Sequence, residues 1–125
     1  MDKKILVVDD DVDVQIQMKA ILGENGYEPL IASNADSAWE ILEREPVDLI
    51  LLDVMMDKDS DGFNFAQRMK NTEAFKKIPI IMVTSVNQKM PFTFGTDDGD
   101  FLPVEKFIEK PIQPDKIMEA VNQFI

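Results

Sequence analysis

The side chains best suited to chemistry in this sequence follow short apolar runs. In chain order they are Asp9, Asp10 and Asp11, then Asp53, then Thr84 and Ser85, and finally Lys110. If the runs are neighbouring parallel strands, these residues meet at the edge of the sheet where ligands bind in open α/β folds. Carboxylates gathered at one place repel one another unless a cation compensates. The pattern therefore predicts a site that holds Mg²⁺ between carboxylates, with Lys110 as a second positive charge.

Each of these residues also has an ordinary structural interpretation. An Asp after a strand is a common helix N-cap, and for Asp11 capping is the preferred interpretation. Thr84 is β-branched and suits a strand, and a single Lys110 is typical of a solvated surface. The joint occurrence of these residues at successive run ends is what favours a functional site.

The composition narrows the chemistry further. The 125-residue chain has no Cys and no His, which excludes thiol nucleophiles, a His general base, a phosphohistidine carrier and the usual zinc ligands. Its formal net charge of −11 disfavours direct binding to nucleic acid or to anionic membranes. The sequence shows no signal peptide and no run of transmembrane length, so a cytoplasmic location is expected by default.

The apolar runs predict the strands of a parallel sheet. Ile5–Val8, Leu49–Leu52 and Ile80–Val83 are continuously apolar, as is typical of strands that are covered on both faces. Phe107–Ile108 is a shorter run, and Glu28–Ala32 predicts a weaker strand.

Residues at helical spacing between these runs predict helices. The apolar positions are Val12, Ile16, Ala20 and Leu22 in the first helix, Ala35, Ala38, Trp39 and Leu42 in the second, Phe65, Ala66 and Met69 in the third, and Ile117, Val121 and Phe124 in the last. Asn34 or Ser33 is expected to cap the second helix, the third spans about residues 63–70, and Pro114 is expected to begin the last. Alternating strands and helices indicate one α/β domain, residues 1–125, with helices on both faces of the sheet.

The motifs at the strand ends resemble those of a known family. They are VVDDD at the first strand, LILLDVMM around Asp53, IIMVTS at the fourth strand and FIEKP at the fifth. In this order and spacing they resemble the receiver domains of response regulators in two-component signalling, chemotaxis-regulator-like domains among them. The resemblance covers essentially the whole chain. It implies a flavodoxin-like, doubly wound sheet of five parallel strands in the order 2-1-3-4-5.

The resemblance also implies roles for the acidic residues. Asp53 is the expected nucleophile, which takes a phosphoryl group from the phosphohistidine of a sensor histidine kinase or of a phosphotransfer protein. Mg²⁺ is the expected cofactor, bound by Asp10, Asp53 and the backbone carbonyl of Met55, with Asp9 assisting through water. Phosphoryl transfer needs mainly positioning and charge neutralisation, which such a site provides.

Further roles follow from the same resemblance. Lys110 is implied to pair with the phosphoryl oxygens, Thr84 to hydrogen-bond the phosphate, and Phe107 to occupy an aromatic switch position. The implied function is that of a phosphoprotein in a phosphorelay that switches the binding of a downstream protein. It is not expected to be an enzyme beyond its own phosphotransfer and autodephosphorylation.

Two segments depart from the family pattern. The loop after Asp53, residues 55–62, lacks the usual Pro and is one residue longer. It also has the D-x-D-x-D-G opening of a Ca²⁺ loop, but the twelfth position from Asp57 is Arg68, which has the wrong charge, so a solvated acidic turn is expected. Residues 87–103 are rich in Pro and Gly, which predicts an irregular region in place of the fourth helix.

Two alternative functions remain open from the sequence. The first is a haloacid-dehalogenase-like phosphatase, which also uses an Asp nucleophile and Mg²⁺. Asp9 and Asp11 have the D-x-D spacing of that class, although no cap domain is evident. The second is a degenerate receiver that acts only as a binding module, against which the intact Asp53, Thr84 and Lys110 argue.

Overall fold

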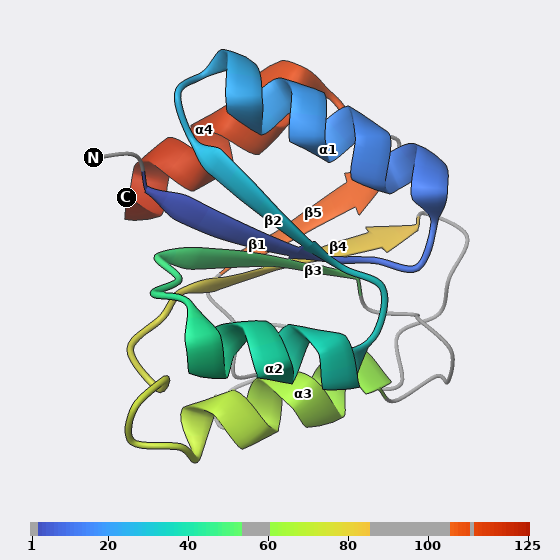
Figure 1. Ribbon diagram of the computed structural model, residues 1–125. Coiled ribbons are helices and arrows are strands. Elements are labelled where there is room, and N and C mark those ends of the chain that lie inside the picture. The colour runs from blue at the N-terminus through green and yellow to red at the C-terminus, as the bar shows by residue number, and fades with distance from the viewer. Residues whose placement is uncertain (1–2, 54–60, 86–105, 111) are drawn as a thin grey trace, which may run out of the picture.

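A computed structural model describes residues 3–53, 61–85, 106–110 and 112–125. These residues form a parallel sheet with helices on both faces, α1 and α4 on one side and α2 and α3 on the other (Figure 1). The sheet has five strands in the order β2-β1-β3-β4-β5, and all neighbouring pairs run parallel. The predicted fold class and strand order are therefore confirmed.

The elements have the following bounds. The strands are β1 (Lys4–Val8), β2 (Glu28–Ala32), β3 (Leu49–Asp53), β4 (Ile80–Ser85) and β5 (Lys106–Lys110). The helices are α1 (Val12–Glu24), α2 (Ala35–Arg44), α3 (Asp61–Lys70) and α4 (Pro114–Phe124). The segment 87–103 lies outside the described residues, so its irregular structure stays a prediction.

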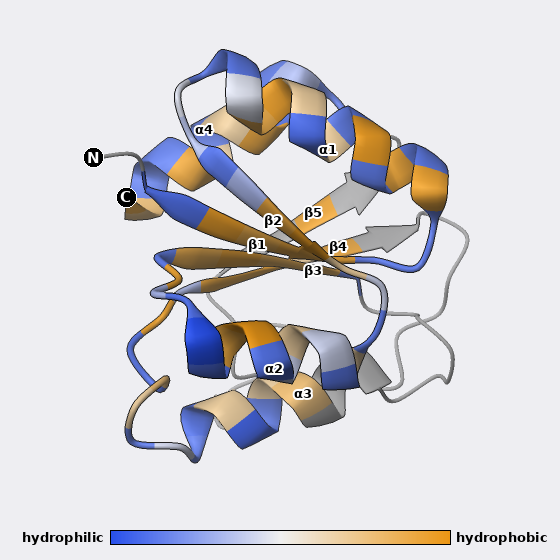
Figure 2. Ribbon diagram, in the orientation of Figure 1, coloured by the Kyte–Doolittle hydropathy of each residue, from blue (hydrophilic) through white to orange (hydrophobic). Residues whose placement is uncertain are grey.

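Successive residues of the central strands pack on opposite sides of the sheet. In β1, Ile5 and Val7 join the residues of α1 and α4, whereas Leu6 and Val8 join those of α2 and α3. All four side chains are at most 1% exposed. This two-sided burial explains why the strands are continuously apolar, and Figure 2 shows the sheet as a hydrophobic layer between helices of mixed hydropathy.

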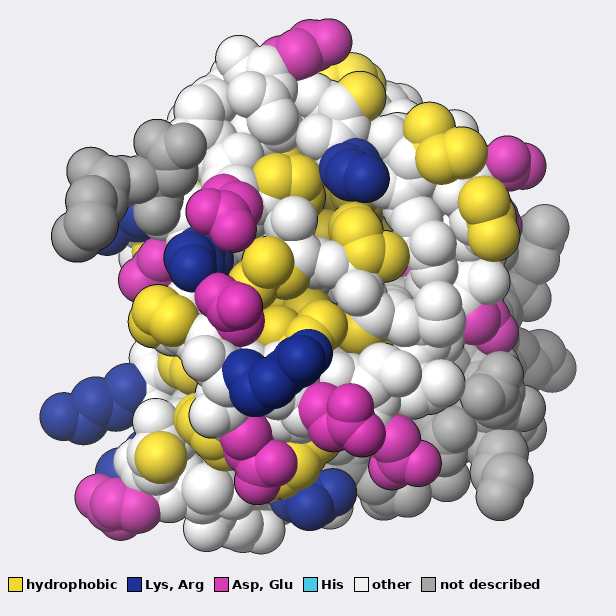
Figure 3. All heavy atoms as spheres, in the orientation of Figure 1, with side chains coloured by type: hydrophobic (Ala, Val, Ile, Leu, Met, Phe, Trp, Pro, Cys, Tyr) yellow, Lys and Arg dark blue, Asp and Glu magenta, His cyan; other side chains and the backbone are white. Residues whose placement is uncertain are grey.

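The inward face of α1 differs from the predicted one. Of the apolar positions predicted for this helix, only Leu22 is buried, and it packs inward together with Val14, Met18 and Ile21. Val12 and Ile16 are 63% and 61% exposed, and Figure 3 shows hydrophobic side chains at the surface over this part of α1. The reason is that apolar and polar residues alternate along Val12–Leu22, which spreads the apolar residues around the helix and leaves the inward face undetermined by spacing.

The other helices follow the sequence more closely. The side chain of Asn34 caps α2 by accepting the Ser37 N–H at 2.8 Å. In α3 the predicted inward residues Phe65, Ala66 and Met69 are all buried, although the helix begins at Asp61 rather than near residue 63.

The last helix begins at Pro114 as predicted. Its residues Ile117 and Val121 are buried as expected, while Phe124 is only partly buried. None of the described helices combines the length and the apolar character that a bilayer crossing requires.

Candidate functional site

The first and third strands end side by side and bring their acidic residues together. Val8 of β1 is opposite Leu52 of β3, so Asp9 and Asp53 come next on the two strands. One carboxylate oxygen from each of Asp9, Asp10 and Asp53 lies within 4.8 Å of the others. Asp9 and Asp53 are only 2% and 4% exposed, whereas Asp10 is exposed. The predicted gathering of these three carboxylates is thus present.

The turn between β1 and α1 is held by successive hydrogen bonds. The Asp9 N–H donates to the Ala32 carbonyl at 3.0 Å, which ties the turn to β2. The Asp11 N–H donates to Asp9 Oδ1 at 2.9 Å, and the Asp13 N–H donates to Asp11 Oδ1 at 2.9 Å. Asp11 is therefore the N-cap of α1, as preferred from the sequence. Its engagement as a cap argues against the D-x-D pair of a dehalogenase-like phosphatase.

The chemistry of the three carboxylates fits a hard divalent cation. Carboxylate oxygens are ligands that Mg²⁺ and Ca²⁺ both accept. Three carboxylates held this close together favour a nearby positive charge. A bound cation would supply such a charge, so the cluster of Asp9, Asp10 and Asp53 is a candidate metal centre.

The ends of β4 and β5 lie at the same edge of the sheet. Asp53 is opposite Val83, so Thr84 comes one position further on β4. On the next strand pair, Ser85 is opposite Lys110, the last residue of β5. The backbones of Thr84 and Lys110 therefore occupy the strand-end positions that the sequence predicts.

The remaining predicted site residues are described less fully. The side chains of Thr84, Phe107 and Lys110 and the whole of Met55 lie outside the described part of the structure, so their roles stay predictions. Most of the Ca²⁺-like motif also lies outside it. However, α3 already begins at Asp61, the fifth position of that motif, whereas a Ca²⁺ loop needs about twelve residues. This early helix favours the expected acidic turn.

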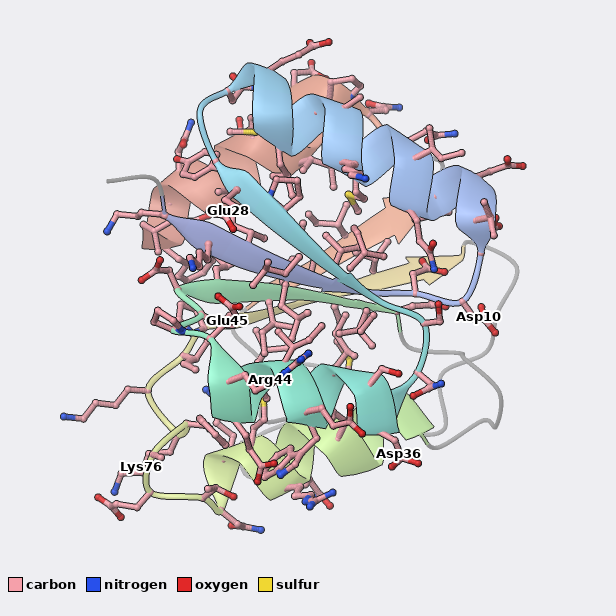
Figure 4. The ribbon with its side chains drawn as sticks, in the orientation of Figure 1. Asp10, Glu28, Asp36, Arg44, Glu45 and Lys76 are labelled. Atoms are coloured by element: carbon pink, nitrogen blue, oxygen red, sulfur yellow. The ribbon has the colours of Figure 1, made fainter. Side chains whose placement is uncertain are left out.

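A separate ion pair lies at the opposite end of the sheet. Lys4 Nζ donates to Glu45 Oε1 at 2.8 Å, and Figure 4 shows Glu28 and Glu45 far from Asp10, at the other ends of the strands. The hydrogen bond with Glu45 raises the pKa of Lys4, and the same bond lowers the pKa of Glu45. Lys4 is thus committed to stabilising that end of the fold and not to the acidic cluster.

One contact at the site has no sequence signal. Gln15, in the second turn of α1, donates from Nε2 to the Asp9 carbonyl at 2.6 Å and to Ser33 Oγ at 3.1 Å. A Gln on a helix surface is ordinarily a solvated residue. Only the folded positions of the two strand-end loops bring it into contact with the acidic turn.

Comparison with known proteins agrees with this architecture. The family model described as response regulator receiver domain matches residues 5–122. The chain is 30% identical over 122 residues to the phosphate regulon transcriptional regulatory protein PhoB of Escherichia coli strain K12, covering 98% of this chain and 51% of that protein. It is also 30% identical over 125 residues to the alkaline phosphatase synthesis transcriptional regulatory protein PhoP of Bacillus subtilis strain 168, covering 100% of this chain and 49% of that protein.

A solved structure gives the same fold. The chemotaxis protein CheY4 of Vibrio cholerae superposes with a TM-score of 0.86 and 22% sequence identity, covering 100% of both chains. The chain spans about half the length of the curated relatives that it matches. Because the family model covers nearly the whole sequence, this chain belongs to the response regulator receiver domain family.

Proposed function

We propose that this protein is the phosphoacceptor of a two-component phosphorelay and that Asp53 carries the phosphoryl group. The donor is the phosphohistidine of a sensor histidine kinase or of a phosphotransfer protein. The observation that carries the proposal is the convergence of Asp9, Asp10 and Asp53 within 4.8 Å at the carboxyl edge of the sheet. Membership of the receiver family supports it.

The proposed cofactor is Mg²⁺. Asp10 and Asp53 would hold it directly, with the backbone carbonyl of Met55, and Asp9 would assist through water. Mg²⁺ demands oxygen ligands and keeps several of its own waters, which suits a site where one carboxylate, that of Asp10, is exposed. When bound, the ion supplies positive charge that offsets repulsion between the carboxylates and an incoming phosphoryl group.

The proposed reaction is an in-line transfer between two nucleophiles. A carboxylate oxygen of Asp53 forms a bond to phosphorus while the phosphorus–nitrogen bond of the phosphohistidine breaks. The departing imidazole nitrogen takes a proton from solvent, and Asp53 becomes an acyl phosphate. Positioning and charge neutralisation supply most of the catalysis in such transfers. The protein therefore acts as a regulatory phosphoacceptor and not as a turnover enzyme.

The switch is proposed to involve the ends of β4 and β5. Lys110 would pair with the phosphoryl oxygens, and Thr84 would hydrogen-bond them. The movement of Thr84 would leave space into which Phe107 turns. The strand-end positions of Thr84 and Lys110 support these roles. A phosphoryl group adds charge and strong acceptors, which can bias a two-state surface.

The proposed output is a change in protein binding. Residues 1–125 would form one receiver domain, whose matched relatives are about twice as long. Their printed names describe transcriptional regulators, but the net charge of −11 argues against direct DNA contact by this domain. A downstream protein partner is therefore the proposed target. The role includes a cytoplasmic location, where the kinase obtains ATP.

The function is tested by exposing the protein to Mg²⁺ and acetyl phosphate and measuring its intact mass. We expect one labile phosphoryl adduct in the wild-type protein and none in Asp53→Asn. Asp115→Asn, an exposed Asp in the first turn of α4, is the matched control and keeps the adduct. Rapid hydrolysis of many phosphate esters would instead favour a phosphatase. Absence of both adduct and Mg²⁺ affinity would favour a binding module.

A further inference from the structure

The side chain of Gln15 links two loops at the edge of the sheet. Its Nε2 donates to the Asp9 carbonyl at 2.6 Å, in the β1–α1 turn, and to Ser33 Oγ at 3.1 Å, in the β2–α2 turn. A carbonyl oxygen can only accept, so the amide atom beside it is the nitrogen, whose two hydrogens serve the two contacts. Gln15 is thus oriented by both loops at once.

The hydrogen bond from Gln15 to the Asp9 carbonyl restrains the backbone of Asp10. The Asp9 carbonyl belongs to the peptide unit that joins Asp9 to Asp10, and this unit is planar. A hydrogen bond that fixes the carbonyl oxygen therefore also fixes the nitrogen and Cα of Asp10. On the other side, the Asp9 N–H is held by the Ala32 carbonyl at 3.0 Å. Both peptide units around Asp9 are consequently restrained.

This restraint matters because Asp10 is the exposed member of the acidic cluster. Without a cation, repulsion favours movement of the Asp10 carboxylate away from Asp9 and Asp53 into solvent. Ordering it again when a cation binds would cost conformational entropy. A hydrogen bond that keeps its backbone in place reduces that cost, as supporting partners of metal ligands commonly do.

We propose that Gln15 is a positioning residue for the divalent cation, which acts by fixing the Asp9–Asp10 peptide unit. The inference rests on the proposed phosphoacceptor function and adds a residue outside the strand-end motifs. Its effect falls on cation affinity, and it reaches phosphorylation only through the cation.

The test compares Gln15→Met with Gln17→Met. Met matches Gln in length but has no N–H donor, and Gln17 is exposed on the same helix. Titration with Mg²⁺ alone should show that Gln15→Met raises the Kd about 3- to 10-fold, the effect of one supporting hydrogen bond. Gln17→Met should leave the Kd unchanged. The acetyl phosphate reaction of Gln15→Met should be slower at low Mg²⁺ and recover the wild-type rate at saturating Mg²⁺.

A measurement on the wild-type protein tests the inference even if Gln15→Met folds poorly. In NMR spectra the side-chain amide signals of Gln15 should shift on Mg²⁺ addition with the same midpoint as the Asp10 backbone amide, and those of Gln17 should not. The inference would be overturned if a folded Gln15→Met bound Mg²⁺ with unchanged affinity, or if the side-chain amide signals of Gln15 did not shift on Mg²⁺ addition. Either result would leave the phosphoacceptor function intact. Failure of the wild-type protein to bind Mg²⁺ would overturn both.

Discussion

Replacing Asp10 by Asn should stabilise the metal-free protein and remove its response to Mg²⁺. The carboxylates of Asp9, Asp10 and Asp53 lie within 4.8 Å of one another. At that separation two unit charges in water repel by about 0.9 kcal/mol, and physiological salt reduces this roughly by half. The Asp10 carboxylate takes part in two such pairs, so its neutralisation should raise the free energy of unfolding by at most about 1 kcal/mol, or Tm by at most about 4 °C.

The assay is thermal unfolding in EDTA and across a Mg²⁺ titration. The free energy of unfolding of the wild-type protein should rise by about 2.7 kcal/mol when Mg²⁺ reaches one hundred times its Kd, whereas that of Asp10→Asn should rise little. Plotted against Mg²⁺ concentration, the unfolding free energies of the two proteins should therefore cross. Glu40→Gln, in the exposed middle of α2, controls for the change in net charge. A lower Tm for Asp10→Asn in EDTA, or a wild-type-like response to Mg²⁺, would refute the electrostatic reasoning.

Three further changes probe the rest of the fold. Lys4→Met should lower Tm near neutral pH. The hydrogen bond lowers the pKa of Glu45 below its ordinary 4.5 and raises that of Lys4 above its ordinary 10.5. The decrease in Tm should therefore be present at any pH between the pKa of Glu45 and that of Lys4. It should fade as acid protonates Glu45 or as alkali deprotonates Lys4, and a loss that persists in acid would contradict the assignment. Arg68→Ala removes a guanidinium 3.9 Å from the ring centroid of Trp39 and should cost about 0.5–1 kcal/mol in urea unfolding, with a change in Trp39 fluorescence; an unchanged midpoint would argue against the contact. Asn34→Ala removes the α2 cap and should cost about 1 kcal/mol, whereas Asn34→Asp should retain most of the stability.

The sequence was sufficient for the strands because burial on both faces leaves an unambiguous pattern. Leu49–Leu52 has no polar residue, and the structure places its members alternately against α1 and α4 or against α2 and α3. The same reasoning failed for α1. Alternation of apolar and polar residues along Val12–Leu22 fits several helix faces, and only packing against the sheet selected the face with Val14 and Met18.

The site shows a similar division. Asp9, Asp10 and Asp53 could be brought together from the sequence because parallel strands end at a common edge. Gln15 could not, because its two contacts depend on the conformation of two separate loops, one of which contains Ser33, eighteen residues further along the chain. Contacts between a helix side chain and a turn carbonyl have no residue pattern from which they could be inferred.

The central claim is that Asp53 accepts a phosphoryl group beside a Mg²⁺ ion held by the acidic cluster. It is tested most directly by a crystal structure of the protein treated with Mg²⁺ and beryllofluoride, a phosphoryl mimic. The predicted result is beryllofluoride on a carboxylate oxygen of Asp53 and Mg²⁺ about 2.1 Å from oxygens of Asp10 and Asp53. Beryllofluoride attached elsewhere, or Mg²⁺ bound away from these two residues, would contradict the account.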